Sequence, residues 1–175
     1  MIEEEYTLNL AGVVRESIVD GPGFRFTVFA QGCPHGCPEC HNPETHDFHG
    51  GKETPIWKIL REVDKNPLLQ GVTFSGGEPV CQAEAFVALA KEVKKRKLDI
   101  VLFSGYTYEE LFAMAKKETK VAELLEQVDL LIDGKFKPSQ KDLSLQFRGS
   151  RNQRIIDMNE TRKRGEITLA KTYMK

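Results

Sequence analysis

The chain has 175 residues, of which 40% are hydrophobic, and its 25 basic and 26 acidic residues give a formal net charge of −1 at pH 7. This length suffices for a sizeable core, so we expect residues 1–175 to form a single domain. The near-zero charge gives no general attraction to nucleic acid or anionic lipid, and no stretch approaches the roughly 20 apolar residues that span a bilayer. Residues 1–6 are acidic, unlike an export signal. We therefore expect a cytoplasmic protein with no nucleic-acid or membrane partner.

Short apolar runs rich in β-branched and aromatic residues alternate with helical patterns along the chain. The sequence predicts strands over residues 24–30, 71–75, 100–104, 128–133 and 154–158. It predicts helices over residues 56–63 and 82–97, a helix opening after residue 107, and a helical stretch ending near residue 126.

Two helix starts carry recognisable signals. Thr54 and Pro55 suit the N-cap and the first helical position of the first helix. Thr107 and Glu110 have the spacing of a capping box, in which each side chain binds a backbone N–H of the other residue.

Strand–helix alternation predicts an α/β fold, with a parallel sheet and helices packed outside it. A complete eight-stranded barrel needs roughly 200 residues or more, so we expect a partial, open TIM-like barrel. Four candidate motifs each follow a predicted strand: residues 33–40, 76–78, 105–106 and 134–135. Because the carboxyl ends of parallel strands share one edge of the sheet, the motifs should converge in space.

The motif after the first of these strands contains Cys33, Cys37 and Cys40, spaced C-x3-C-x2-C on a loop rich in glycine and proline. A structural zinc site and an ordinary electron-transfer cluster each take four ligands. Three local thiolates fit a [4Fe–4S] cluster with one iron open to a substrate. Clustered cysteines also suit a reducing compartment and a metal site better than a disulfide scaffold.

A zinc knuckle is the alternative interpretation of this loop, because zinc accepts three cysteines and one histidine. The candidate histidines are His35, His41, His46 and His49. The Gly76-Gly77-Glu78 loop downstream has no role in a zinc knuckle, which favours the cluster. Cys81 follows a different strand, so we interpret it as a free cysteine outside the ligand set.

Several segments together resemble a known enzyme family. The cysteine triplet with Ser75–Pro79 resembles the radical S-adenosylmethionine (SAM) enzymes. Asp20–Arg25 and Cys40–Pro43 resemble the subgroup that installs a glycyl radical on a partner protein. Asp133–Phe136 and Arg148–Arg154 resemble, within that subgroup, the activating enzymes of anaerobic ribonucleotide reductase. The matching segments extend over nearly the whole chain.

The resemblance implies a set of cofactor contacts. Cys33, Cys37 and Cys40 would hold one [4Fe–4S] cluster per chain. The loop of Gly76, Gly77 and Glu78 would bind the methionine end of SAM, with backbone close to the cofactor and Glu78 near its amino group. The backbone of Glu39, Cys40 and His41 would lie along the adenine. Many relatives carry an aromatic residue just before the third cysteine, where this chain has Glu39.

Two further segments admit more than one interpretation. Asp133 and Lys135 form either a common Asp-Gly turn with a solvated lysine or a contact to the ribose or carboxylate of the cofactor. The basic segment Arg148–Arg154 is typical of a solvated surface, and only the resemblance suggests partner docking.

The resemblance also implies the reaction. A reduced cluster would pass one electron to SAM, and the 5′-deoxyadenosyl radical would abstract hydrogen from a glycine of the partner. We expect the partner to be the large subunit of anaerobic ribonucleotide reductase, and the electron donor to be of low potential, such as flavodoxin or ferredoxin. No catalytic acid or base is required, and none is indicated by the motifs. The alternatives are pyruvate formate-lyase or another glycyl radical enzyme as partner, or a non-catalytic metal-binding or electron-carrier module.

Overall fold

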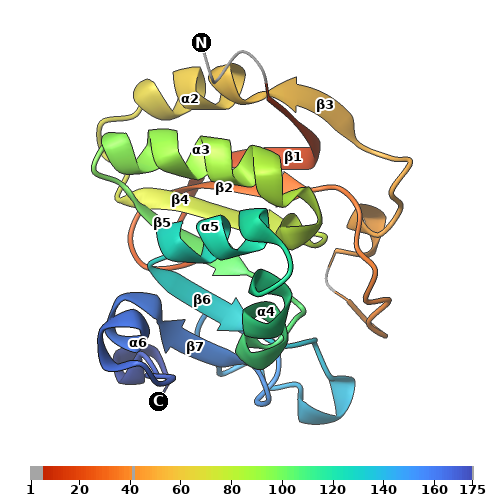
Figure 1. Ribbon diagram of the computed structural model, residues 1–175. Coiled ribbons are helices and arrows are strands. Elements are labelled where there is room, and N and C mark those ends of the chain that lie inside the picture. The colour runs from red at the N-terminus through yellow and green to blue at the C-terminus, as the bar shows by residue number, and fades with distance from the viewer. Residues whose placement is uncertain (1–5, 41, 175) are drawn as a thin grey trace.

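The computed structural model describes residues 6–40 and 42–174 and contains one seven-stranded sheet with the order β3-β1-β2-β4-β5-β6-β7 (Figure 1). The strands are β1 (Thr7–Ser17), β2 (Arg25–Ala30), β3 (Lys52–Pro55), β4 (Gly71–Gly76), β5 (Asp99–Phe103), β6 (Leu130–Asp133) and β7 (Arg154–Asp157). The helices are α2 (Ile56–Asp64), α3 (Ala83–Lys95), α4 (Tyr108–Ala115), α5 (Thr119–Gln127) and α6 (Met158–Arg164). Short 3-10 turns are η1 (Pro43–Thr45), η2 (Pro79–Gln82), η3 (Pro138–Gln140) and η4 (Lys171–Tyr173).

The centre of the sheet is parallel and its margins are antiparallel. β2, β4, β5 and β6 are parallel neighbours, as the sequence predicts. β1 and β3 add antiparallel pairs on one side, and β7 adds one on the other. The fold is therefore mixed α/β, and the strand order ends at β3 and β7 without closing into a ring.

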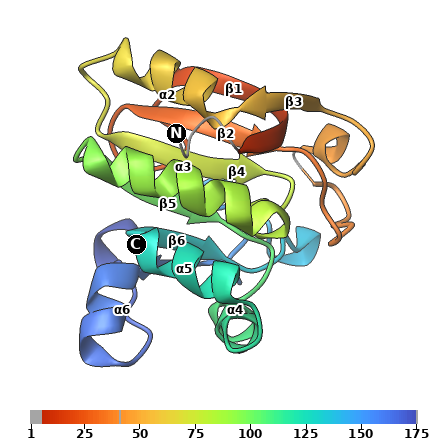
Figure 2. The ribbon, with the colours of Figure 1, turned by 45° about the horizontal axis from the view of Figure 1, so that its top comes forward.

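Side chains alternate between the two faces of the central strands. One set packs under α2, α3, α4 and α5, which cover a single face of the sheet (Figures 1 and 2). Phe74 on β4 and Phe86 on α3 belong to this core, with ring centroids 4.7 Å apart. The alternate set, which includes Phe29, Ser75 and Phe103, faces the other side. The two-residue period of the strands thus assigns one face to the core and leaves the other for a site.

Two segments cover part of this second face. The connection between β1 and β2 is fixed by Arg25, which is fully buried and donates to Thr73 Oγ1 at 2.7 Å and to the Pro22 carbonyl at 3.0 Å. The C-terminal segment packs Tyr173 against Phe147, with ring centroids 5.5 Å apart. Within the described residues, no helix has the length and apolar character needed to cross a membrane.

The helix starts partly follow the sequence prediction. Thr107 and Glu110 form the expected capping box at α4. The expected N-cap at Thr54 is wrong, because Thr54 lies in β3 and Pro55 occupies the N-cap of α2. Thr54 instead pairs with Leu8 of β1, and its hydroxyl donates to the Lys52 carbonyl at 3.3 Å, which keeps it from capping the helix.

Candidate metal and cofactor site

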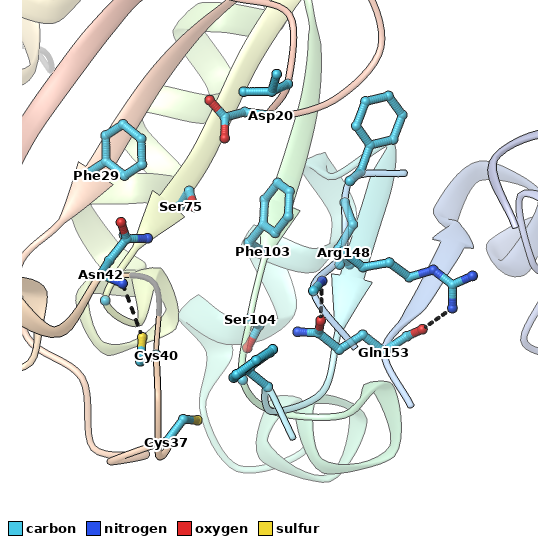
Figure 3. Close-up of a pocket in the computed structure, with 18 of the residues that line it drawn as sticks. Asp20, Phe29, Cys37, Cys40, Asn42, Ser75, Phe103, Ser104, Arg148 and Gln153 are labelled. Carbon is cyan, nitrogen blue, oxygen red and sulfur yellow. Dashed lines mark hydrogen bonds between the residues drawn. The ribbon is translucent and has the colours of Figure 1, made fainter. Parts of the chain in front are cut away.

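The carboxyl ends of the four parallel strands surround a cavity of about 1030 Å³. Its floor contains one side chain from each of these strands: Phe29, Ser75, Phe103 and Ile132. Figure 3 shows Cys37 and Cys40 on one side of this floor and Arg148 and Gln153 on the other.

All four sequence motifs contribute to the lining of this cavity. The contributing motif residues are Cys33, Cys37, Cys40, Gly76, Gly77, Gly105, Gly134 and Lys135. The predicted convergence at the strand ends is therefore confirmed.

The cysteine thiols influence one another. Burial raises the pKa of the Cys33 thiol, and Glu78, Cys37 and Cys40 raise it further, against the backbone N–H of His35. Burial also raises the pKa of the Cys37 thiol, while the Phe136 N–H and the Lys135 ammonium lower it. All three predicted ligands line the same cavity, and Figure 3 shows Cys37 and Cys40 on one side of it.

The donor set of the loop fits an iron–sulfur cluster. Cys33, Cys37 and Cys40 all line the cavity, and thiolates are the usual protein ligands of such clusters. Among the candidate histidines for a zinc site, His35 is bound to Glu78 and His49 is exposed. Among residues 6–40 and 42–174, no group of three His, Cys, Asp or Glu side chains is already arranged around a single point.

Gly76, the last residue of β4, and Gly77 after it are held against β2 and the cysteine loop. The Gly77 N–H donates to the Ala30 carbonyl and the Glu78 N–H to the Gly32 carbonyl, both at 2.8 Å. A Cβ on Gly77 would lie 2.4 Å from the Gly32 oxygen. A Cβ on Gly76, which has φ +102°, would lie 2.4 Å from the Ala30 nitrogen. The structure thus requires both glycines for packing, and they also line the cavity.

Glu78 has a position that the motif did not indicate. Its side chain is fully buried and is not part of the cavity lining. It accepts hydrogen bonds from Gly105 N at 2.8 Å, Ser104 Oγ at 2.9 Å and Val80 N at 3.2 Å, and it pairs with His35 Nε2 at 2.7 Å. Its carboxylate therefore joins three loops of the protein, and contact of Gly76, Gly77 and Glu78 with a cofactor stays a prediction.

Asp133 and Lys135 both line a smaller pocket, and only Lys135 also lines the main cavity. Asp133 is buried and binds the Tyr108 N–H at 2.8 Å and the guanidinium of Arg154. This carboxylate and Glu109 raise the pKa of Arg154. Asp133 thus helps to hold β6 to β7 and α4, and cofactor contact stays a prediction for both residues.

The predicted adenine contacts are only partly described. Cys40 lines the cavity, and its sulfur accepts from the Asn42 N–H at 3.4 Å. Glu39 is exposed, has a left-handed φ of 57° and is not part of the lining. His41 lies outside the described residues.

The segment Arg148–Arg154 forms a folded wall of the cavity, in which Arg151 is exposed, Ser150 is buried and the other residues are half-buried. Gln153 Oε1 accepts from the N–H groups of Gly149 at 2.9 Å and Ser150 at 3.1 Å, and Gln153 Nε2 donates to the Gly134 carbonyl at 3.0 Å. Arg148 Nη1 donates to the Gln153 carbonyl at 2.7 Å. The spacing of polar residues in the sequence did not indicate this network, because most of its hydrogen bonds join residues within one folded loop.

The chain matches known proteins at two levels, a class of iron–sulfur proteins and a family within it. Residues 19–156 match the family described as "4Fe-4S single cluster domain", so the chain is an iron–sulfur protein of this class. Curated relatives named "Anaerobic ribonucleoside-triphosphate reductase-activating protein" share 38% identity over 146 residues (Pasteurella multocida) and 35% over 147 residues (Escherichia coli K12). These matches cover 79% and 78% of this chain and 90% of each relative. The chain belongs to the family of anaerobic ribonucleoside-triphosphate reductase-activating proteins.

Two further matches have lower sequence identity to this chain. The protein of the same name from Enterobacteria phage T4 is 33% identical over 144 residues, covering 78% of this chain and 86% of the relative. Among solved structures, QueE from Escherichia coli aligns with a TM-score of 0.44 and 17% identity, covering 58% of this chain and 53% of that chain. The curated relatives confirm the family and the enzyme class predicted from the motifs.

Proposed function

We propose that this protein is a radical SAM enzyme that installs a glycyl radical on the large subunit of anaerobic ribonucleotide reductase. One observation carries the proposal: the cysteine loop after β2 and the glycine loop after β4 open on the same cavity. The fold belongs to the same proposal, with β2, β4, β5 and β6 as part of an open TIM-like barrel.

The residues of the cavity suit the two cofactors. Cys33, Cys37 and Cys40 would hold a [4Fe–4S] cluster. The backbone of Gly76 and Gly77 and the ammonium of Lys135 face the same space and would receive the amino-acid end of SAM. The apolar floor residues would pack against the adenosyl group and exclude water.

With both cofactors bound, the cluster would supply one electron to SAM, which would yield methionine and a 5′-deoxyadenosyl radical able to take hydrogen from a glycine. The protein binds and orients these groups and keeps solvent out. A flavodoxin or ferredoxin would supply the electron, in the cytoplasm. The partner is taken from the names of the relatives, which refer to anaerobic ribonucleoside-triphosphate reductase.

Electron paramagnetic resonance tests the proposal. The reconstituted, reduced protein is mixed with SAM and the large reductase subunit, and a glycyl radical doublet is expected on the reductase. The Cys33→Ala variant is the control and should give no doublet. A doublet on pyruvate formate-lyase alone would change the partner and keep the chemistry. No SAM cleavage by a cluster-loaded protein would overturn the proposal.

A further inference from the structure

A buried side-chain pair connects the cysteine loop to the rest of the site. His35 lies between Cys33 and Cys37, on a loop whose flanking Pro34 and Gly36 are exposed. Its own side chain is only 5% exposed, and its Nε2 lies 2.7 Å from Glu78 Oε1. A polar ring is buried at such a place only when it is hydrogen-bonded.

The slot that receives the ring is shaped for it. His35 packs edge-on against Tyr106, with ring centroids 4.5 Å apart and planes at 76°. A Cβ on Gly105 would lie 2.4 Å from His35 Cδ2. The β5 loop thus provides an aromatic wall on one side and the space left by a glycine on another.

The same carboxylate also connects the loop after β4 to the loop after β5. Glu78 follows β4, and it binds Ser104 Oγ and Gly105 N, which follow β5. A carboxylate offers about four acceptor positions, and the donors from these loops and from His35 share them. The buried Glu78 carboxylate therefore connects the middle of the cysteine loop to the ends of β4 and β5.

The start of the cysteine loop is fixed differently. The Gly32 N–H donates to the Thr45 carbonyl at 2.6 Å, and the Cys33 N–H donates to the His46 carbonyl at 3.2 Å. These bonds hold the start of the loop to the segment that follows it in sequence. His35 connects its middle to a part of the chain 43 residues away.

We propose that His35 is a positioning residue that docks the cysteine loop on Glu78 and thereby determines how firmly Cys33 and Cys37 hold the cluster. The inference rests on the proposed function in one respect, namely that these cysteines are cluster ligands. Outer-shell groups that orient metal ligands commonly change metal affinity by about 10- to 100-fold. Losing the His35–Glu78 bond should have an effect of this size on cluster retention.

Three variants separate the hydrogen bond from simple packing. In His35→Gln the amide nitrogen can reach the place of Nε2, whereas the shorter side chain of His35→Asn cannot. His49→Ala removes an exposed histidine nearby and serves as the matched control. Each protein is reconstituted anaerobically, and the rate of iron loss to a chelator is measured together with the electron paramagnetic resonance spectrum of the reduced cluster, with and without SAM.

We expect His35→Asn to lose iron about 10- to 100-fold faster than wild type, His35→Gln to be close to wild type, and His49→Ala to be unchanged. The SAM-induced change in the cluster spectrum should weaken in His35→Asn and persist in His35→Gln. Equal iron loss from His35→Asn and wild type would overturn the proposal, and so would equally fast loss from both His35 variants.

Two further results distinguish the causes of failure. The cluster-free His35→Asn protein should melt within a few degrees of wild type, because Glu78 keeps its other donors; a large fall would assign His35 to the fold and overturn the proposal. If wild type takes up no iron at all, the proposed function fails first. If wild type loads normally and the variants match it, only the role of His35 is refuted.

Discussion

Gly77 lies against the carbonyl oxygen of Gly32, so that a Cβ on Gly77 would stand 2.4 Å from that oxygen and 2.9 Å from the Thr45 oxygen. Both neighbours are backbone atoms, which cannot move aside as a flexible side chain would. The contact joins the glycine loop to the cysteine loop. The two halves of the site therefore depend on each other for their shape.

Gly77→Ala should damage both halves at once. Overpacking of this kind costs about 1–3 kcal/mol of stability, and the displaced cysteine loop should also lose iron. Iron content, SAM binding and urea unfolding measure the three effects. Gly12→Ala is the control, because no atom lies within 4 Å of a Cβ at that position. Weakened SAM binding with unchanged stability and iron would show instead that Gly77 serves only the approach of a ligand.

We expect three of the four cysteines to be required for the cluster and the fourth, Cys81, to be dispensable. Replacing Cys33, Cys37 or Cys40 with alanine should abolish the cluster, because each lines the cavity. Cys81→Ala should retain about four irons per chain, since Cys81 is exposed and outside the lining. Iron analysis and the visible spectrum after anaerobic reconstitution provide the measurement. A tightly bound single zinc in wild type would contradict the whole assignment.

Arg25 should matter for stability and not for chemistry. It is fully buried and forms an ion pair with Asp99 at 2.5 Å as well as hydrogen bonds to Thr73 and Pro22. Arg25→Met removes these donors from a buried position, and because Asp99 is partly exposed the loss should be about 1–3 kcal/mol. Urea unfolding of the cluster-free protein checks this. A loss below about 1 kcal/mol would mean that water replaces the guanidinium.

Asp129 should give a pH-dependent contribution to stability. Burial raises the pKa of this carboxyl, but Lys94, Asn159 and the Ile100 N–H outweigh it, so the pKa is lowered. Because the folded-state pKa lies below the unfolded value of about 3.9, the contribution is present above pH 4 and disappears as pH falls through the folded-state pKa. Asp129→Asn should cost about 1–2 kcal/mol at pH 7.

The same substitution should cost less near pH 3 than at pH 7, when urea unfolding of the two proteins is compared at both values. Glu84→Gln, at an exposed position, should change stability by less than about 0.5 kcal/mol at either pH. A penalty for Asp129→Asn that is equal at both pH values would show that the charge of Asp129 is not responsible.

The central strands and the convergence of the motifs could be predicted from the sequence. Buried parallel strands are continuous apolar runs, and the rule that their carboxyl ends share an edge needs no side-chain detail. The antiparallel strands at the edge of the sheet were harder to predict. β1 shifts register after Leu10 and again after Val14, which interrupts its alternation, and β3 consists of Lys52–Pro55, which has no strand-like composition. These strands form because a neighbouring backbone is available for pairing.

Within the site, the sequence indicated which residues gather but not which way they face. The Glu78 carboxylate is bound to His35, Ser104 and Gly105, a set of partners that the motif did not indicate. Such pairs join residues 26 to 43 positions apart, and no periodicity encodes them. Asp133 likewise forms an ion pair with Arg154, which the sequence did not indicate.

The order of the site along the chain has a consequence for biogenesis. The cysteine loop lies near the N-terminus, whereas Lys135 and the wall at Arg148–Arg154 follow about 100 residues later. At roughly 5–20 residues per second, a ribosome needs on the order of 5–20 s to complete the interval. During that time the nascent thiols have no cavity around them. We therefore expect delivery of iron and sulfide to be most productive once the wall of the cavity has been synthesised.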